Sequence, residues 1–397
     1  MVEQIIMGSG SYTLNGFNFD HIVPESGLSF EEQVRSCIEQ LQEFIHQEDV
    51  TLFVTQQTFF ISAKSREEYE VRSALIKEEL LSHCGSSLPA TSIVAQAPGG
   101  ARDVVLELIC TKAVNHKQVT YKSLSGVNYT VVSYRGYKCV HCAGLMGQVG
   151  DTITEASESA FEQAVSILNA EGLSIKHIIR QWNYIENIAV VEDENAPQNY
   201  QDFNDVRARY YNRVRFENGF PAATGIGQDT GGVIIGFIAL SESDIISVKP
   251  IANPGQIDAH SYSELVLEGN SSQKCTPKFE RAKLVTIGNR NYIYVSGTAS
   301  ILGEKSVHEG DVEKQTLTTI DNIKRLFSRE NQQKLGLDFD VNRIQFSHLR
   351  VYVKHRKDMP LVEKVCDAEL NYKSSLFLES DVCRENLLVE IEGVFNI

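Results

Sequence analysis

Two carboxylates near the C-terminus share one face of a short apolar segment. Glu390 and Glu392 stand in the sequence LLVEIEG, and side chains two positions apart lie on the same side of an extended strand. A carboxyl group that is partly withdrawn from water has a raised pKa, and such a group can donate a proton near neutral pH. The pattern therefore predicts a general acid, although a strand edge that faces solvent would show the same alternation.

Two arginines stand out in an otherwise acidic chain. Arg207 lies in a segment with helical spacing, four residues before Tyr211. Arg350 alternates with His348 and Tyr352, which predicts a strand with one polar face along a cleft. A guanidinium group binds a carboxylate through two parallel hydrogen bonds, so both arginines are candidates for holding an acidic ligand. A solvated surface position would explain either arginine as well.

Two motifs that could hold a phosphate or a metal are incomplete. The turn at 220–227 (FPAATGIG) consists of small residues, which let a backbone approach a ligand closely. It lacks the Gly-Lys-Ser/Thr ending of a phosphate-binding loop, and no predicted helix follows it. Cys139 and Cys142 form a CxxC pair, but the next cysteine is Cys275, so no second ligand pair follows at a suitable spacing. We therefore predict no metal site.

The composition limits the classes of protein to which the chain can belong. Its 397 residues are 42% apolar, which suffices for a packed core, and their formal net charge is −15. Such a charge argues against a nucleic-acid partner, because nucleic-acid binding depends on basic residues. No apolar run reaches the roughly 18 residues of a membrane-spanning helix, and no secretory signal is visible. With eight scattered cysteines, the chain reads as a reduced cytoplasmic protein without a membrane partner.

The elements that would position the candidate residues occur twice along the chain. A strand ending in small residues, an amphipathic helix and a second strand are predicted at 137–144, 154–169 and 178–185, and again at 292–299, 312–327 and 341–353. This repeat predicts an α+β fold with one unit at 136–240 and a second unit, which carries Glu390, at 291–397. Residues 241–290 would connect the two units, and residues 1–135 would form a degenerate N-terminal α/β portion.

The joint order of several motifs resembles the chorismatases, a family within the Rid (YjgF-like) superfamily of imine deaminases. The matching segments are 182–185 (WNYI), 203–207 (FNDVR), 220–227, 279–282 (FERA), 296–300 (SGTAS), 349–353 (LRVYV) and 381–393. The resemblance implies two fused Rid-like units, with chorismate-mutase-like α+β topology and mixed sheets packed by helices. It also implies cleavage of chorismate without a metal or organic cofactor, by protonation of the enolpyruvyl group and release of pyruvate.

The resemblance also assigns roles to individual residues. The first Glu of the VEIE stretch is the acid in the superfamily, which makes Glu390 the catalytic candidate here and Glu392 the second choice. Cys383 and Gly297 match the type that forms 3-hydroxybenzoate, and the Cys383 thiol would help to rearrange the intermediate. The two carboxylates of chorismate require cationic partners. The candidates for binding the substrate are Arg207, Arg350, Gly297, Thr224 and Tyr211.

The same fold is compatible with other outcomes. Some family members hydrolyse chorismate to a dihydroxycyclohexadiene carboxylate, and others give a mixture of 3- and 4-hydroxybenzoate. An imine or enamine deaminase, or a metabolite-binding protein without turnover, would also share these elements. Simple imine deaminases carry a substrate-binding arginine at the position where this chain has Ser375. Because the superfamily commonly forms trimers, the resemblance suggests a homotrimer.

Overall fold

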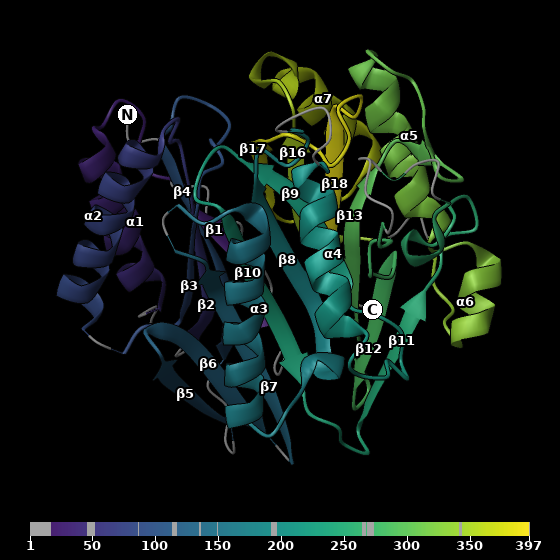
Figure 1. The fold of residues 1–397 in the computed structure, drawn as a ribbon, viewed down its shortest axis with the longest axis horizontal. Helices are drawn as coiled ribbons and strands as arrows, with labels where there is room; N and C mark the ends of the chain where they lie inside the picture. The colour runs from purple at the N-terminus through teal and green to yellow at the C-terminus, as the bar shows by residue number, and fades with distance from the viewer. Residues whose placement is uncertain are drawn as a thin grey trace.

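Three sheets with helices packed against them make up the computed structural model of the chain (Figure 1). The structure describes residues 17–45, 52–85, 87–112, 117–134, 136–148, 150–191, 197–263, 267, 274–340 and 344–396. The first sheet has the strand order β1-β4-β2-β3. Its elements are β1 (Phe17–Ile22), α1 (Phe30–Ile45), β2 (Leu52–Ile61), α2 (Arg66–Cys84), β3 (Ala90–Val94) and β4 (Val104–Lys112).

The second and third sheets share one topology. Their strand orders are β5-β6-β7-β10-β8-β9 and β11-β12-β13-β18-β16-β17. The second sheet and its helices comprise β5 (Lys117–Leu124), β6 (Val127–Tyr134), β7 (Tyr137–Met146), α3 (Ile153–Ala170), β8 (Ile178–Glu186), α4 (Asn199–Tyr211), β9 (Ala222–Gln228) and β10 (Val233–Leu240). The third comprises β11 (Ile246–Ile251), β12 (Ala282–Ile287), β13 (Arg290–Ala299), α5 (Val312–Arg325), α6 (Arg329–Leu335), β16 (Phe346–Val353), α7 (Met359–Glu369), β17 (Ser375–Glu379) and β18 (Val389–Asn396), with a small hairpin of β14 (Ile301–Leu302) and β15 (Lys305–Ser306). A mixed α/β fold with mixed sheets packed by helices is therefore confirmed.

The strands do not follow the predicted division of the chain. The second sheet begins with β5 and β6, which lie before residue 136, and the third begins with β11 and β12, which lie inside 241–290. β11 is mostly solvent-accessible and contains Pro250, so its sequence lacks a clear apolar pattern. Residues 264–266 and 268–273 of the predicted connection, and 341–343 of the predicted strand 341–353, lie outside the described residues.

Side-chain caps begin several of the helices, including α2, α3, α5 and α6. Thr152 begins α3 with a capping box, in which its side chain accepts from the Glu155 N–H and the Glu155 side chain accepts from the Thr152 N–H. Phe161 of α3 stacks on Phe203 of α4, with ring centroids 5.9 Å apart. This packing fixes α4 over the second sheet, and α4 carries several of the residues described below. No helix among the described residues is long and apolar enough to cross a membrane.

The sheet faces that are not covered by helices pack against one another. The pairing of their central strands is also equivalent from one sheet to the next. One apolar cluster includes Phe60, Tyr184 and Tyr352, one from each sheet. The strand partners are Val105 for Phe60, Ile234 for Tyr184 and Glu390 for Tyr352. Glu390 therefore occupies a central strand position that is aliphatic in the other two sheets.

Candidate active site

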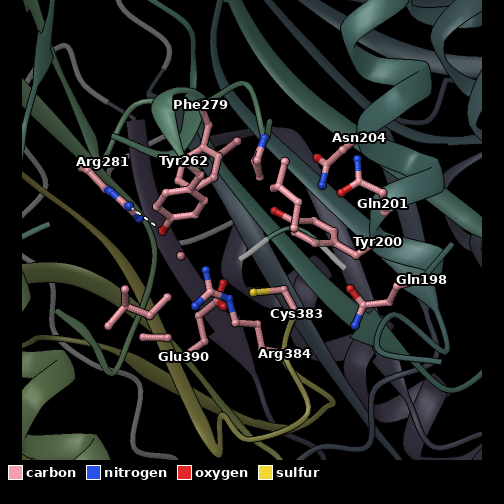
Figure 2. Close-up of a pocket in the computed structure, with 17 residues that line it drawn as sticks. Gln198, Tyr200, Gln201, Asn204, Tyr262, Phe279, Arg281, Cys383, Arg384 and Glu390 are labelled. Atoms are coloured by element: carbon pink, nitrogen blue, oxygen red, sulfur yellow. Dashed lines mark hydrogen bonds between the residues drawn. The ribbon is translucent and has the colours of Figure 1, made fainter. Parts of the chain in front are cut away.

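A pocket of about 680 Å³, its open mouth included, lies between the second and third sheets. One wall comes from α4 and β9, and the opposite wall from β13, β18 and the segment before β12. Figure 2 shows the side chains of α4 on one side of the space, with Glu390, Cys383 and Arg384 on another. The lining residues are Gln198, Tyr200, Gln201, Asn204, Ala223, Gly225, Tyr262, Leu267, Pro277, Phe279, Arg281, Gly297, Ala299, Ile301, Cys383, Arg384 and Glu390.

Glu390 is the carboxylic acid of this pocket. It lies on β18, between β13 and β16, and is 4% exposed. Burial and, to a smaller extent, the negative charge of Glu392 raise the pKa of Glu390 to about 8, against the opposing effects of Arg180 and Arg281. The Glu390 carboxyl group thus holds its proton at neutral pH, as a general acid must.

Gly297 gives this carboxyl group its space. A Cβ atom built on Gly297 would overlap Oε1 of Glu390 and lie 2.9 Å from its Cδ. The Gly297 N–H donates to the Thr224 hydroxyl oxygen at 3.0 Å, so the glycine backbone is held in place. Only a residue without a side chain lets the acid pack against β13 in this way.

We expect Gly297→Ala to lower kcat for the reaction at this site about 10- to 100-fold, because the added methyl group must push the acid aside. A displacement of about 1 Å can cost about 100-fold in rate. Gly236→Ala is the matched control, since the nearest atom to a Cβ on this buried strand glycine, among the described residues, would be the Cys142 carbonyl oxygen at 3.4 Å. Steady-state kinetics on both variants measure the effect, and an unchanged kcat for Gly297→Ala would contradict it.

Cys383 also lines the pocket, seven residues before the acid. Burial raises the pKa of its thiol to about 12, and the charge of Glu390 acts in the same direction. The thiol therefore stays protonated near neutral pH. At this site Cys383 can offer a neutral S–H group to a ligand, but it is not prepared to act as a thiolate nucleophile.

Two arginines that the sequence analysis did not single out face the pocket. Arg281 donates through Nη2 to the Tyr262 hydroxyl oxygen at 2.7 Å, and Arg384 donates through Nη1 to the Glu304 carbonyl at 2.8 Å. Both guanidinium groups lie near the Tyr262 ring, with Cζ atoms 5.4 Å and 5.5 Å from its centroid (Figure 2). Within the described part of the chain neither has a carboxylate within 4.0 Å, so both leave positive charge for an anionic ligand. The sequence signals were the FERA motif and the position next to Cys383.

The arginines predicted from the sequence lie outside the lining. Arg350 is 2% exposed and pairs with carboxylates of the protein itself, Glu107 and Glu392. Arg207 is equally buried and donates through Nη2 to the Asn204 side-chain oxygen. Its Nε has no hydrogen-bond partner among the described residues. Since Asn204 lines the pocket, the Arg207 charge lies one residue behind the wall.

Thr224 and Tyr211 also lie behind the wall. The Tyr211 hydroxyl donates to the Gln181 side-chain oxygen at 2.6 Å. The Thr224 hydroxyl donates to Glu392 and accepts from Arg180 Nη2 at 2.7 Å. Of the seven predicted site residues, the structure thus brings together Glu390, Cys383 and Gly297 at the pocket, and it places Arg207, Arg350, Thr224 and Tyr211 behind it.

Glu392 differs from Glu390 in its surroundings. Its Oε1 accepts from Trp182 Nε1 at 2.8 Å and lies 3.1 Å from Arg350 Nη1. Its Oε2 accepts from Arg180 Nη2 at 2.6 Å and from the Thr224 hydroxyl. Three hydrogen-bond donors and the ion pair with Arg350 occupy both oxygens of Glu392, and Glu392 does not line the pocket.

The described residues contain no group of three or more His, Cys, Asp or Glu side chains that could hold a metal ion. The CxxC cysteines are both buried on β7, and neither is in a disulfide. The residues that line the pocket supply a buried carboxylic acid, a neutral thiol and two guanidinium groups.

Comparisons with known proteins show which family the chain resembles. The family model described as chorismatase FkbO/Hyg5-like, N-terminal, matches residues 115–239. A 3-hydroxybenzoate synthase of Streptomyces hygroscopicus is 32% identical over 259 residues, which are 64% of this chain and 72% of that protein. A chorismatase of Streptomyces rapamycinicus is 33% identical over 226 residues, 56% of this chain and 65% of that protein, so the match spans just under two thirds of its length.

A solved structure supports the fold over nearly the whole chain. The crystal structure of a chorismatase superposes with a TM-score of 0.67 at 22% identity, covering 97% of this chain and 100% of that one. The similarity in sequence to the 3-hydroxybenzoate synthase extends over most of that relative. The family predicted from the motifs is confirmed, and the chain belongs to the chorismatases.

Proposed function

We propose that this protein converts chorismate to 3-hydroxybenzoate and pyruvate, with Glu390 as the general acid. The observation that carries the proposal is a buried carboxyl group with a pKa of about 8 in a pocket that also holds two arginines without carboxylate partners. Chorismate is a dianion with an enolpyruvyl ether, so it needs both a proton and positive charge. The two products together contain the atoms of chorismate, and the overall conversion therefore consumes neither an oxidant nor water.

The proton transfer follows from the geometry of the acid. Glu390 would protonate the methylene carbon of the enolpyruvyl group, which leaves an oxocarbenium-like centre at the ether carbon. The charge of Glu392, held by three hydrogen-bond donors and by the ion pair with Arg350, supports the proton affinity of Glu390 before the transfer. We assign the acid to Glu390 rather than Glu392 because Glu390 lines the pocket and Glu392 does not.

Substrate binding is assigned to the arginines of the pocket. Arg281 and Arg384 would hold the two carboxylates of chorismate through charge-assisted hydrogen bonds. Arg207 would add positive charge through Asn204, and Gly297 would leave room for the acid. Thr224 and Tyr211 would hold the wall in shape. In this proposal Arg350 supports the site from behind and does not touch the substrate.

The direct test is to incubate the purified protein with chorismate. We expect pyruvate, measured with lactate dehydrogenase and NADH, and 3-hydroxybenzoate, measured by chromatography, in equal amounts. The absence of pyruvate at an enzyme concentration comparable to that of substrate would overturn the proposal. A dihydroxycyclohexadiene carboxylate or 4-hydroxybenzoate in place of 3-hydroxybenzoate would overturn the product assignment. If chorismate did not react and the protein released ammonia from an enamine, the protein would be a deaminase.

Cys383→Ala tests the product assignment separately. The substitution removes the neutral thiol and leaves space for a water molecule beside the intermediate. We therefore expect the dihydroxycyclohexadiene carboxylate to replace most of the 3-hydroxybenzoate, while the rate of pyruvate release stays within about threefold, a difference of less than 1 kcal/mol in the barrier. Cys366→Ala, at a buried cysteine outside the pocket, is the control. Unchanged product from Cys383→Ala would remove the thiol from the mechanism.

The equivalent topology of the second and third sheets supports a further proposal, that each is a Rid-like unit. We also propose that the enzyme acts in the cytoplasm, in line with its free cysteines. The homotrimer stays a prediction, and light scattering on a sizing column would test it.

A further inference from the structure

A buried carboxylate of the first sheet reaches the centre of the molecule. Glu107 of β4 is 1% exposed and accepts hydrogen bonds from Nε and Nη2 of Arg350. It also accepts from His348 Nε2 at 2.8 Å. Both donors belong to β16 of the third sheet, so Glu107 joins the N-terminal portion of the chain to the strand beside β18.

Glu107 and Glu392 flank one guanidinium group because their strands are equivalent. Glu107 pairs with Thr58 between β4 and β2, and Glu392 pairs with Arg350 between β18 and β16. The equivalent position in the second sheet, opposite Trp182, is Gly236. Two of the three equivalent positions thus bring a carboxylate to the centre, and Arg350 lies between them.

The contacts continue from Arg350 to the acid. Arg350 Nη1 lies 3.1 Å from Oε1 of Glu392, and the other oxygen of Glu392 accepts from the Thr224 hydroxyl. The Thr224 oxygen accepts from the Gly297 N–H, and Gly297 packs directly against the Glu390 carboxyl group. A series of hydrogen bonds, the ion pair between Arg350 and Glu392 and one packing contact therefore connects Glu107 to Glu390.

The charges in this series balance. Glu107 and Glu392 carry two negative charges, and Arg180 and Arg350 carry two positive charges. The titratable and charged groups that face them are His21 of β1, Arg180 and Tyr184 of β8, His348, Arg350 and Tyr352 of β16, Glu390 of β18, and Arg281 and Cys383 beside the pocket. If Glu107 lost its charge, Arg180 and Arg350 would together exceed the remaining carboxylate, Glu392, by one positive charge. This excess charge would lie behind Glu390.

We propose that Glu107 is a positioning residue for the reaction at Glu390: by holding Arg350, it keeps Glu392 on Thr224 and thereby fixes the acid against Gly297. The inference rests on the proposed function and gives the N-terminal sheet a part in it. Without Glu107, the Arg350 guanidinium group keeps one hydrogen bond, from Nη1 to the Tyr184 hydroxyl oxygen at 2.9 Å, and can turn toward Glu392. That movement would loosen the contacts of Glu392 with Thr224 and neutralise the charge that favours the protonated form of Glu390.

The test is Glu107→Gln in the full chain. An excess positive charge favours the ionised form of Glu390, so the pH above which kcat falls should move downward by about half a unit to one unit. At pH 7.5 kcat should fall about tenfold, as for a slightly displaced acid, while KM stays within about twofold.

Glu171→Gln is the matched control, because Glu171 is a buried carboxylate that pairs with Lys122 and Lys138 and does not contact the pocket. It should cost stability without moving the pH profile.

A second readout needs no substrate. Infrared difference spectra across a pH titration report the protonated carboxyl band of Glu390, which is assigned by its loss in Glu390→Gln. Glu107→Gln should shift the midpoint of that band downward by the same amount as the kinetic profile. If the wild type releases no pyruvate, the proposed function is wrong. The pH midpoint of the Glu390 carboxyl band would still test whether Glu107 acts on Glu390. A folded Glu107→Gln variant with the band and profile of the wild type would overturn the inference.

Glu107→Asp decides the question if the Gln variant does not fold. Asp keeps the negative charge but is one methylene shorter, so it cannot reach both Nε and Nη2 of Arg350 from the same backbone position. We expect the pH profile to stay in place and kcat to fall severalfold. A kcat equal to that of the wild type, or a shifted profile, would overturn the positioning role.

Discussion

Replacing Glu390 with Gln is expected to slow pyruvate release from chorismate by about 10³-fold, which is the usual contribution of a general acid. Gln has nearly the size of the protonated Glu and carries no charge, so the pocket should keep its shape. Chorismate should therefore still bind, with a dissociation constant within a fewfold of the wild-type value. Single-turnover kinetics measure the rate, and calorimetry on the inactive variant measures the affinity.

The pH dependence gives this prediction a second, independent part. Burial raises the pKa of Glu390 from an ordinary 4.5 to about 8, so wild-type activity should fall as pH rises through about 8, when the acid loses its proton. The unfolded chain loses that proton near pH 4.5. The free energy of unfolding of the wild type should therefore decline between pH 4.5 and pH 8, by about 1.4 kcal/mol for each unit of difference in pKa.

Glu390→Gln removes this titration, so its stability relative to the wild type should increase over the same pH window and level off above about pH 8. Urea denaturation at several pH values tests the difference. Glu385→Gln, at an exposed position five residues earlier, should change neither the rate nor the pH dependence. Turnover above one tenth of the wild-type rate in Glu390→Gln would move the acid role to Glu392.

The local elements could be predicted from the sequence because their apolar periodicity is strong. The predicted helix at 154–169 is α3, Ile153–Ala170, and the predicted strand at 292–299 is β13, Arg290–Ala299. The alternation around Glu390 also predicted a strand correctly. It could not decide between a solvent edge and a buried strand, because β18 is buried only by pairing with β13 and β16.

The acid, the thiol and the glycine of the site could be predicted because motifs along the chain mark them. The roles of the arginines could not, since an arginine is assigned by the carboxylate it meets. Arg350 meets Glu107 across 243 positions of sequence, and no local pattern reports that contact. Arg281 lies in a long connection between β11 and β12, where periodicity gives no indication of which side chains face a pocket.

Arg350→Met is expected to lower the free energy of unfolding by about 3 to 5 kcal/mol at neutral pH, because removal of one partner leaves buried charges without compensation. Among the described residues, Glu107 would then keep its hydrogen bond from His348, and Glu392 would keep those from Arg180, Trp182 and Thr224. Burial alone would raise the pKa of Glu107, yet Arg350 and His348 lower it to about 2. The stability that this ion pair provides is therefore present above pH 4.5 and is lost as pH falls toward 2.

The contrast with Arg281→Met separates a structural arginine from one that binds the substrate. Arg281 has no carboxylate within 4.0 Å among the described residues, so its loss should lower the free energy of unfolding by only about 1 to 2 kcal/mol, the cost of its hydrogen bonds to the Ile257 carbonyl and the Tyr262 hydroxyl. The same substitution should raise KM for chorismate at least about tenfold, since a charge-assisted hydrogen bond to the substrate contributes about 1.5 to 3 kcal/mol. Urea denaturation and steady-state kinetics on both variants give the comparison. If Arg350→Met were as stable as the wild type and had the raised KM, Arg350 would be the substrate ligand that its sequence pattern suggested, and the carboxylates around it would have to be held by other means.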